Sequence, residues 1–399
     1  KIDLLERETI PFYEPGLEEY LKRNRKERRF FLEKDPEKAI RDNDIIFIAV
    51  GTPSRDDGEA DLSYLEEAVR TIARESKEPK IVVTKSTVPV GTNQWIKETL
   101  LHLNPVVSFL VVSNPEFLRE GRAVQDFFHP DKVVVGTEEE EAREVMKEIY
   151  RPLYLLNTPF IFCNLETAEL IKYANNAFLA TKITFINQIA NLCDAVGADV
   201  HVVARALGMD GRISPKFLHP GPGFGGSCFP KDTKALVKTG ERYGVDMSLA
   251  REVVIANERQ KEEMVRKLER LLGGVRGKRI CVLGLSFKAE TDDVRESPAI
   301  TIIKKLLQEG AKVQAHDPQA IPNARKILGE KVQYFDDMYQ AMEKCDALCI
   351  LTEWNSYRNL DLDIVKSNLT GRVILDTRNV LDPELVKEKG FIYEGVGRR

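Results

Sequence analysis

The sequence has few of the residues that build disulfide scaffolds or metal centres. Among its 399 residues are six cysteines, none in a Cys-x-x-Cys pair, and only five histidines. This supply predicts neither a disulfide framework nor a zinc site, so we expect no metal and a reducing, cytoplasmic setting. The longest uncharged stretch, around Leu103–Pro115, is far shorter than the roughly 18 to 20 apolar residues of a membrane span.

The charge balance also excludes several classes of partner. The net charge is -4, with 43% hydrophobic and 31% charged residues, which is typical of a folded globular chain. Such a balance gives no general attraction to nucleic acid or anionic lipid. We therefore expect a small ligand, no nucleic acid and no membrane. At roughly 150 residues per domain, the length predicts two or three domains.

Between Asp44 and Arg151, short β-branched runs alternate with charged helical stretches. This alternation is typical of βαβ units in a parallel sheet. Ligands of such sheets bind beyond the carboxyl ends of the strands, so we expect a site at residues 51–53, 86–89 and 114–116. The predicted strands are 44–50, 80–84, 109–113 and 132–135.

From about Asn164 the apolar residues recur at three- and four-residue steps, which predicts one long helix of about 30 residues. Further helical segments reach Leu272, and Gly273–Gly277 marks a boundary. A second βαβ series follows, with strands predicted at 278–284, 312–316, 347–351 and 372–376. We therefore predict an α/β fold with two Rossmann-like, doubly wound parallel-sheet domains, joined by a long central helix and a helical domain. The expected bounds are 1–163, 164–272 and 276–399.

The segment Pro220–Asp232 places four glycines and two prolines directly before Cys228. Glycines allow backbone N–H groups to approach a ligand, and a cysteine at a helix N-terminus near Lys231 would have its thiolate favoured. A buried structural cysteine is the alternative. Linkers rarely place Cys, Lys and Asp directly after such a run, so the pattern favours a reactive Cys228.

Two further pairs are candidates for proton and charge chemistry. Glu116 and Glu120 would share one face if a helix begins at Pro115, where a solvated helix face competes with a general-base role. Lys172 and Asn176 align on the long helix. A lysine that merely extends to solvent is the ordinary interpretation, whereas a desolvated lysine beside an asparagine could bind an oxyanion.

Taken together, these segments resemble the UDP-glucose 6-dehydrogenase family of nucleotide-sugar dehydrogenases, and the resemblance covers essentially the whole chain. The Ser227-Cys228-Phe229 pattern is similar to the UDP-glucose branch, since N-acetylhexosamine enzymes commonly carry a His before the Cys. GDP-mannose dehydrogenases share Gly-Gly-Ser-Cys and remain the close alternative. The matching segments are Ile10–Leu17, Val50–Pro53, Lys85–Gly91, Asn114–Gly121, Leu170–Ala177, Gly223–Asp232, Gly284–Lys288 and Asp292–Ser297.

The resemblance implies NAD-dependent oxidation of a primary alcohol to a carboxylate in two hydride transfers. Cys228 would form a thiohemiacetal and then a thioester that water hydrolyses. The resemblance also assigns Lys172 with Asn176 to oxyanions, Asp232 with Thr87 to the first proton, and Glu116 to thioester hydrolysis. The implied cofactor contacts are Val50, Thr52, Pro53, Ser86, Thr87, Glu120 and Arg295.

For the nucleotide-sugar, the resemblance implies contacts from Phe217, Gly225, Lys288 and Arg378, in addition to Glu116, Lys172 and Asn176. An arginine suits a diphosphate by charge and fork geometry. Arg212 would be donated across the interface of a homodimer or higher homo-oligomer. A nucleotide-sugar-binding protein with impaired catalysis is the alternative from another functional class.

Family members begin with a strand, a Gly-x-Gly-x-x-Gly turn, a helix and a second strand that ends in an acidic residue. Lys1 aligns just after that acidic residue, so we expect the natural protein to carry this segment before Lys1. Pyrophosphate is held by the N–H groups of the glycine turn, and a ribose hydroxyl by the acidic residue. Without them, the chain would keep only the nicotinamide side of the cofactor site.

The first prediction therefore concerns relative affinities. The 399-residue chain should bind UDP-glucose or UDP measurably, bind NAD very weakly and turn over little. Titration calorimetry on this chain tests the prediction. The control is an extended form, in which the initial strand, glycine turn, helix and second strand of a family member precede Lys1. Ordinary micromolar NAD binding by the chain itself would contradict the prediction.

Overall fold

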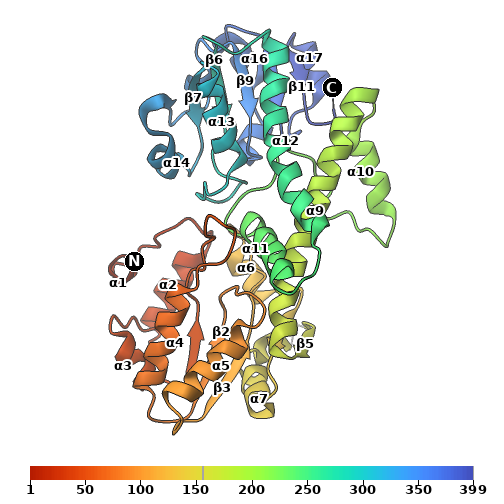
Figure 1. Ribbon diagram of the computed structural model, residues 1–399. Helices are drawn as coiled ribbons and strands as arrows, with labels where there is room; N and C mark the ends of the chain where they lie inside the picture. Colours follow the sequence, from red (N-terminus) through yellow and green to blue (C-terminus); the bar gives the residue numbers. More distant parts are fainter. Residues whose placement is uncertain (155–156, 399) are drawn as a thin grey trace. The chain divides into compact units, whose positions relative to one another are not determined.

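The computed structural model describes residues 1–154 and 157–398, which form two compact units, each with its own parallel-type sheet (Figure 1). Unit 1 comprises Lys1–Asn176 with Lys234–Met247, and unit 2 comprises Ala177–Thr233 with Ser248–Arg399. The division falls within two helices, α9 (Leu165–Val196) and α11 (Phe229–Arg242). The three-domain bounds expected from the sequence stay a proposal.

The sheet of unit 1 has five strands in the order β1-β2-β3-β4-β5. β1, β2 and β3 are parallel, as are β4 and β5, whereas β3 meets β4 antiparallel at Ser113 and Gly136. Because β1 to β3 are parallel, their carboxyl ends share one edge, where the predicted site loops begin. The strands are β1 (Ile45–Ile48), β2 (Lys80–Thr84), β3 (Phe109–Ser113), β4 (Val133–Gly136) and β5 (Phe160–Cys163).

Helices cover both faces of this sheet. The apolar sides of α4 and α5 bury Leu65 and Ile96 with Val82 on one face, while α7 buries Met146 with Val83 on the other. α3 begins where Asp35 accepts hydrogen bonds from the first turn, a standard N-cap. The helices are α1 (Ile2–Glu6), α2 (Leu17–Lys26), α3 (Pro36–Arg41), α4 (Ser63–Glu75), α5 (Thr92–Leu103), α6 (Ala123–Phe128), α7 (Glu140–Ile149) and α8 (Arg151–Tyr154).

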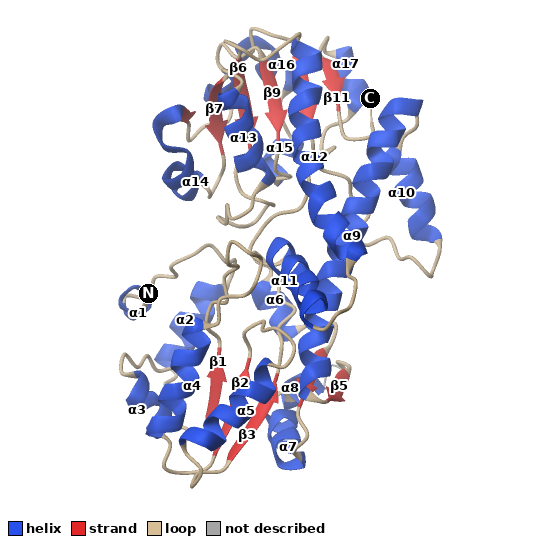
Figure 2. Cartoon of the chain, in the orientation of Figure 1, coloured by secondary structure: helices blue, strands red, loops and turns tan. Residues whose placement is uncertain are grey.

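Unit 2 contains a six-stranded, wholly parallel sheet in the order β11-β10-β9-β6-β7-β8 (Figure 2). Read from β8, this is the doubly wound order 3-2-1-4-5-6, whose direction reverses between β6 and β9. Ligands of such sheets bind at the reversal, beyond the carboxyl ends. The strands are β6 (Arg279–Leu283), β7 (Lys312–His316), β8 (Val332–Tyr334), β9 (Ala347–Ile350), β10 (Val373–Asp376) and β11 (Ile392–Glu394).

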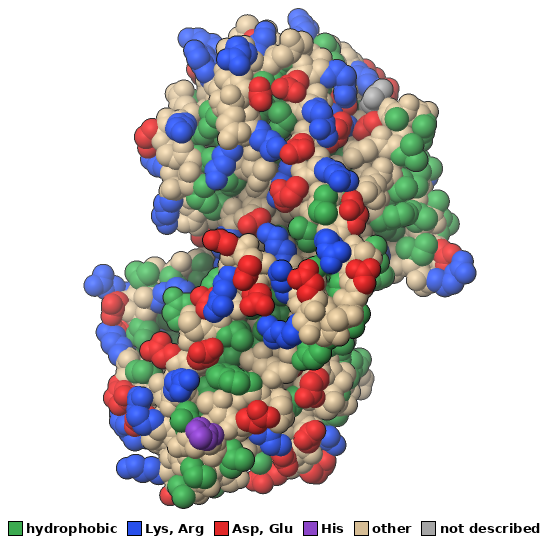
Figure 3. Space-filling view, viewed as in Figure 1, with side chains coloured by type: hydrophobic (Ala, Val, Ile, Leu, Met, Phe, Trp, Pro, Cys, Tyr) green, Lys and Arg blue, Asp and Glu red, His purple; other side chains and the backbone are tan. Residues whose placement is uncertain are grey.

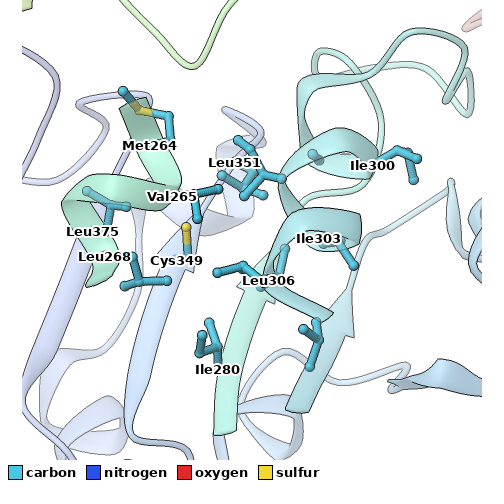
Figure 4. Close-up of a cluster of buried hydrophobic side chains, with 14 of the residues drawn as sticks. Met264, Val265, Leu268, Ile280, Ile300, Ile303, Leu306, Cys349, Leu351 and Leu375 are labelled. Atoms are coloured by element: carbon cyan, nitrogen blue, oxygen red, sulfur yellow. The ribbon is translucent and has the colours of Figure 1, made fainter. Parts of the chain in front are cut away.

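The main core of unit 2 lies between this sheet and α12 with α13 (Figure 4). Leu268 of α12 and Ile303 of α13 pack with Ile280 of β6, while α16 and α17 cover the other face. The helices are α10 (Val200–Met209), α12 (Ser248–Leu272), α13 (Pro298–Gln308), α14 (Ile321–Leu328), α15 (Asn355–Arg358), α16 (Leu362–Asn368) and α17 (Pro383–Glu388), with short 3-10 turns at Gly329–Lys331 and Gln340–Met342.

The α/β fold class predicted from the sequence is confirmed. The predicted bounds of β2, β3 and β7 are those observed, and α9 spans 32 residues. The sequence prediction missed β5, β8 and β11, each of which lies at an edge of its sheet. Among residues 1–154 and 157–398, no helix combines the length and apolar character that a membrane span requires.

Candidate active site

The loops after β1 and β2 are joined by side-chain hydrogen bonds. Thr52 Oγ1 donates to the carbonyl of Thr87 (2.8 Å), and Ser86 Oγ donates to the carbonyl of Val50 (2.7 Å). Apart from Gly51 and its two neighbours in the chain, no described residue has a heavy atom within 4 Å of the position that a Cβ of Gly51 would take. Four of the predicted cofactor contacts thus come together beside open space, with Pro53 next in the chain. This arrangement fits the close approach of a flat nicotinamide ring.

In unit 1, the buried side chain of Lys172 pairs with the part-exposed carboxylate of Glu116. Lys172 is 3% exposed, and its Nζ donates to the Glu116 carbonyl and, at 3.0 Å, to Glu116 Oε1. The other carboxylate oxygen of Glu116 accepts from the Leu118 N–H (2.5 Å). Asn176, one turn further along α9, is also buried. The predicted alignment of Lys172 with Asn176 on one helix is therefore present, with the lysine desolvated rather than extended to solvent.

The expected helix from Pro115 is wrong, because residues 114–119 have no regular secondary structure and α6 begins only at Ala123. Asn114 explains the difference: its side chain is fully buried, donates to the Val134 carbonyl (2.7 Å) and accepts from Tyr150 Oη (2.6 Å). These contacts hold residues 114–119 in an irregular conformation. Glu116 and Glu120 consequently do not share a helix face.

Two lysines that the sequence reasoning did not single out lie in the same region. Lys85 Nζ donates to Asn114 Oδ1 and Tyr150 Oη, both at 3.1 Å. Burial lowers the pKa of Lys85 to about 8, against the opposing effect of Glu116 and with a further contribution from Lys172. Lys132 Nζ lies 4.3 Å from the centre of the Phe117 ring, and burial lowers its pKa as well. The position of Lys85 directly after β2, at the edge where parallel sheets bind ligands, could have identified it from the sequence.

Glu169 connects α9 to the loop that carries Thr87. It is 2% exposed, and its carboxylate accepts from the Gly91 N–H, the Asn93 N–H and Asn93 Nδ2, each at 2.7 Å. These donors lie at the N-terminus of α5, which follows the Ser86–Pro89 segment. Desolvation nevertheless outweighs the three hydrogen bonds and raises the pKa of Glu169 to about 7.

In unit 2, Cys228 lies immediately before α11, where the Asp232 N–H donates to its carbonyl (2.8 Å). Cys228 is half-buried, and its Sγ lies 3.5 Å from Ser227 Oγ. The N-terminus of a helix favours a thiolate because of its unsatisfied N–H groups. Asp232 is fully buried and pairs with Lys231 (2.5 Å). This placement agrees with the setting expected for a reactive cysteine.

Two of the predicted substrate contacts of unit 2, Lys288 and Arg378, lie after β6 and β10. The Arg378 guanidinium donates to the carbonyls of Leu351 and Phe287, both at 2.8 Å. A Cβ on Gly221 would lie 3.4 Å from Arg378 Nη1, so the glycine-rich loop passes beside this arginine. Lys288 follows Phe287 directly. Arg378, which also pairs with Glu353 (3.2 Å), and Lys288 therefore lie at the edge beyond β10 and β6.

Phe217 and Gly225 belong to the same region of unit 2. The Phe217 ring packs edge-on against Phe229, with centroids 6.1 Å apart, and its φ of 63° is left-handed. A Cβ on Gly225 would fall 2.4 Å from the carbonyl oxygen of Glu296, so only glycine fits. These close approaches leave the loop little freedom to move.

The two remaining predicted residues lie on the surface. Arg212 is 89% exposed in its side chain and pairs with Asp210 of its own loop (2.6 Å). The Arg295 side chain is 65% exposed and pairs with Asp293 (2.7 Å). The structure does not bring Arg212 to the residues around Cys228. Its donation to a partner subunit stays a proposal. In the part of the chain that the structure describes, no group of three or more His, Cys, Asp or Glu could hold a metal ion.

Comparisons with known proteins identify the family of the chain. The UDP-glucose/GDP-mannose dehydrogenase family matches with its NAD binding domain at residues 1–154, its central domain at 166–259 and its UDP binding domain at 281–383. A UDP-glucose 6-dehydrogenase of Rhizobium meliloti is 49% identical over 402 residues, covering 100% of this chain and 92% of the relative. One of Bacillus subtilis is 47% identical over 399 residues, covering 100% and 86%.

Among solved structures, a UDP-glucose dehydrogenase from Pyrobaculum islandicum superposes with a TM-score of 0.93 at 40% identity, covering 100% of this chain and 90% of that one. Fold and site loops together define a nicotinamide-dependent dehydrogenase of the doubly wound class. The chain belongs to the UDP-glucose/GDP-mannose dehydrogenase family, and its cofactor is NAD.

The unusual pKa of Glu169 leads to a prediction about stability and pH. Its folded-state pKa of about 7 exceeds the ordinary value of 4.5. The folded chain therefore binds more protons than the unfolded chain between these values, and the contribution of Glu169 to stability falls as pH rises through that window. Glu169→Gln removes this titration, so the decrease in melting temperature from about pH 5 to about pH 7 should become smaller.

Thermal unfolding monitored by circular dichroism at several pH values measures this difference. Glu98→Gln on α5 is the matched control, because Glu98 is an exposed carboxylate on the helix that Glu169 caps. The control should retain the pH dependence of the unsubstituted chain. Parallel melting curves for Glu169→Gln and the unsubstituted chain at every pH would show that Glu169 does not titrate in this range.

Proposed function

We propose that this protein catalyses the four-electron oxidation of UDP-glucose to UDP-glucuronate. The observation that carries the proposal is the position of Cys228: a half-buried thiol at the N-terminus of α11, at the end of a buried glycine-rich loop that passes beside Arg378. The match of residues 281–383 to a UDP binding domain supports a UDP-sugar as substrate. The names of the two relatives support glucose as the sugar.

The chemistry requires a covalent intermediate because an aldehyde must be oxidised again without escaping. NAD, when bound, supplies the oxidising power by accepting one hydride in each of two oxidations. In the first, the C6 alcohol loses a hydride and its hydroxyl proton and becomes an aldehyde. Cys228 Sγ then adds to the carbonyl carbon, forming a C–S bond and a thiohemiacetal. Loss of the second hydride from C6, together with the proton of the thiohemiacetal hydroxyl, gives a thioester. Water then adds to the thioester carbon and the C–S bond breaks, which releases the carboxylate, a proton and the thiol.

The residues of unit 1 supply groups for the charges that develop. Lys172 is desolvated and, with Asn176, would donate hydrogen bonds to the oxygen that becomes an alkoxide or oxyanion. Glu116, held by Lys172 and the Leu118 N–H, would accept the proton of the hydrolytic water. Thr87 would take part in removing the first proton, and Glu120 would lie near the nicotinamide. Asp232, a residue of unit 2, is the other group that we assign to the first proton.

Unit 2 supplies the groups for the diphosphate and the sugar. Arg378 and Lys288 present positive charge after β10 and β6, at the edge where doubly wound sheets bind ligands. Gly225 allows the backbone to approach the sugar closely, and Phe217 offers an aromatic face. Arg295, from the same unit, would contact the cofactor. Each of these roles is part of the proposal.

The proposal includes a homodimer, because exposed apolar side chains gather on unit 2. Figure 3 shows hydrophobic side chains grouped over α10, where Met209 is 81% exposed. Phe178, Phe185 and Leu192 of α9 are also exposed, at 65%, 49% and 57%. Apolar patches of this kind mark protein interfaces. An interface there would give the exposed Arg212 a route to the substrate of a partner subunit.

Cys228→Ala tests the covalent route. In the extended form of the chain, this substitution should abolish formation of the sugar acid, because no thiohemiacetal can form. Liquid chromatography of the reaction with UDP-glucose and NAD measures the acid. Cys163→Ala is the control, since Cys163 is another half-buried thiol and lies in β5. Acid formation at a near-normal rate by Cys228→Ala would exclude the thioester mechanism.

Substrate choice is tested by competition. UDP-glucose should be preferred over GDP-mannose and UDP-N-acetylglucosamine by at least about tenfold in kcat/KM, equivalent to about 1.4 kcal/mol. Faster oxidation of GDP-mannose would identify the chain as a GDP-mannose dehydrogenase. Binding of UDP-glucose by the extended form without any NAD reduction would instead favour a nucleotide-sugar-binding protein with impaired catalysis.

A further inference from the structure

The glycine-rich loop before Cys228 is buried, although it has few side chains to anchor it. Residues 220–226 are all buried, and none of them carries a polar side chain. Buried backbone N–H and C=O groups need partners, because each unsatisfied group destabilises the fold. The partners of this loop therefore determine where its backbone, and the cysteine that follows, can lie.

Amide side chains of α12 provide two of these partners. Asn257 Oδ1 accepts from the Phe224 N–H (2.8 Å), and Asn257 Nδ2 donates to the Phe224 carbonyl (3.0 Å). One side chain thus pairs with both polar groups of one residue, as a neighbouring strand would. Gln260, one turn further along α12, donates from Nε2 to the Gly221 carbonyl (2.9 Å). The two amides are each 3% exposed.

Helix α9 provides further contacts, and outside these helices the Gly226 N–H donates to the Arg295 carbonyl (2.9 Å). Asn187 Oδ1 accepts from the Gly221 N–H (2.8 Å), and Asn191 Nδ2 donates to Gln260 Oε1 (2.8 Å). Gly221 is therefore paired at both its N–H and its C=O. We call Asn187, Asn257 and Gln260 the amide clamp. It makes four hydrogen bonds to the loop, and every one is to the backbone.

The loop sequence matches the clamp. Gly223 has a φ of 112°, and a Cβ there would lie 2.9 Å from Asn257 Oδ1. A cavity of about 150 Å³ that opens to solvent is lined by the clamp, by Thr184 and Asn191, and by Gln188, Ala256, Arg259, Glu263 and Arg266. The buried atoms Thr184 Oγ1 and Asn187 Nδ2 have no protein hydrogen-bond partner among the described residues. Such a cavity has room for ordered water, which would satisfy these groups.

We infer that Asn257 and Gln260 are positioning residues for Cys228: by fixing the backbone of Gly221–Phe224, they hold the thiol at the N-terminus of α11. The inference rests on the proposed function for the role of Cys228. Neither residue touches the reacting atoms in this scheme. They act on the addition of Cys228 Sγ to the aldehyde, because a displaced thiol would not react with the aldehyde that the first oxidation produces.

The test is a stoichiometry. For the extended form without a substitution, two NADH should form for each UDP-glucose consumed. Asn257→Leu keeps the approximate volume and removes both hydrogen bonds to Phe224. In the extended form this substitution should lower the rate of acid formation about tenfold to a hundredfold. The NADH-to-sugar ratio should fall from two towards one, and free aldehyde should become detectable with a hydrazide reagent.

A second measurement needs no NAD. On the 399-residue chain, iodoacetamide alkylation of Cys228, followed by mass spectrometry, should slow at least about threefold in Asn257→Leu, since reactivity follows the thiolate fraction. Gln260→Met is the milder second variant, and it tests the positioning role if Asn257→Leu does not fold. Val265→Ala, on the same helix but within the sheet core (Figure 4), is the stability control. It should lower the melting temperature and leave both readouts unchanged.

The outcomes separate the two hypotheses. If the unsubstituted extended form does not produce two NADH per UDP-glucose, the proposed function is wrong. The alkylation rates would still measure the effect of the clamp on Cys228. Suppose instead that the unsubstituted extended form produces two NADH per UDP-glucose. If the clamp variants then show the same NADH ratio, the same alkylation rate and the same rate of acid formation, the positioning role is wrong. Equal effects of Val265→Ala and Gln260→Met would also overturn it, because both would then act through stability alone.

Discussion

The need to satisfy buried backbone groups shapes the part of this molecule that carries Cys228. A loop composed largely of glycine and proline has little apolar side chain to bury, so the hydrophobic effect alone cannot hold it. Side-chain amides from α9 and α12 hold it instead, through hydrogen bonds to Gly221 and Phe224. The glycines admit close neighbours such as the Glu296 carbonyl. The loop is therefore fixed by contacts that its own side chains do not make.

In unit 1, several charged side chains are shielded from water. Lys172 and Glu116 compensate each other, and the Leu118 N–H satisfies a further oxygen of the carboxylate. Lys85 lies in the same region, where it donates to the amide of Asn114 and the hydroxyl of Tyr150, and its pKa falls to about 8. An excess of ammonium groups around one carboxylate suits a reaction in which negative charge develops on oxygen. The same burial that raises the pKa of Glu169 makes its three hydrogen bonds necessary.

The sequence predicted what depends on local patterns. Apolar, β-branched runs predicted the central strands β2, β3 and β7, whereas β5, β8 and β11 are short edge strands whose signal is weak. The loops after β1 and β2 were correctly predicted to come together, because parallel strands end at one edge. The helix at Pro115 was wrong, since the tertiary contacts of Asn114 override local preference. Asn257 and Gln260 were missed because their partners lie 33 and 39 residues away, and no spacing rule connects an amide to a distant backbone.

The amide clamp has a consequence for how such a protein could diversify. Since its contacts reach only backbone atoms of Gly221 and Phe224, the side chain at position 227, next to the thiol, is not part of the support. Selection could exchange Ser227 for another residue and alter which sugar is accepted, while the scaffold that presents the thiol stayed the same. The support of the loop and the residue beside the thiol could therefore change independently of each other.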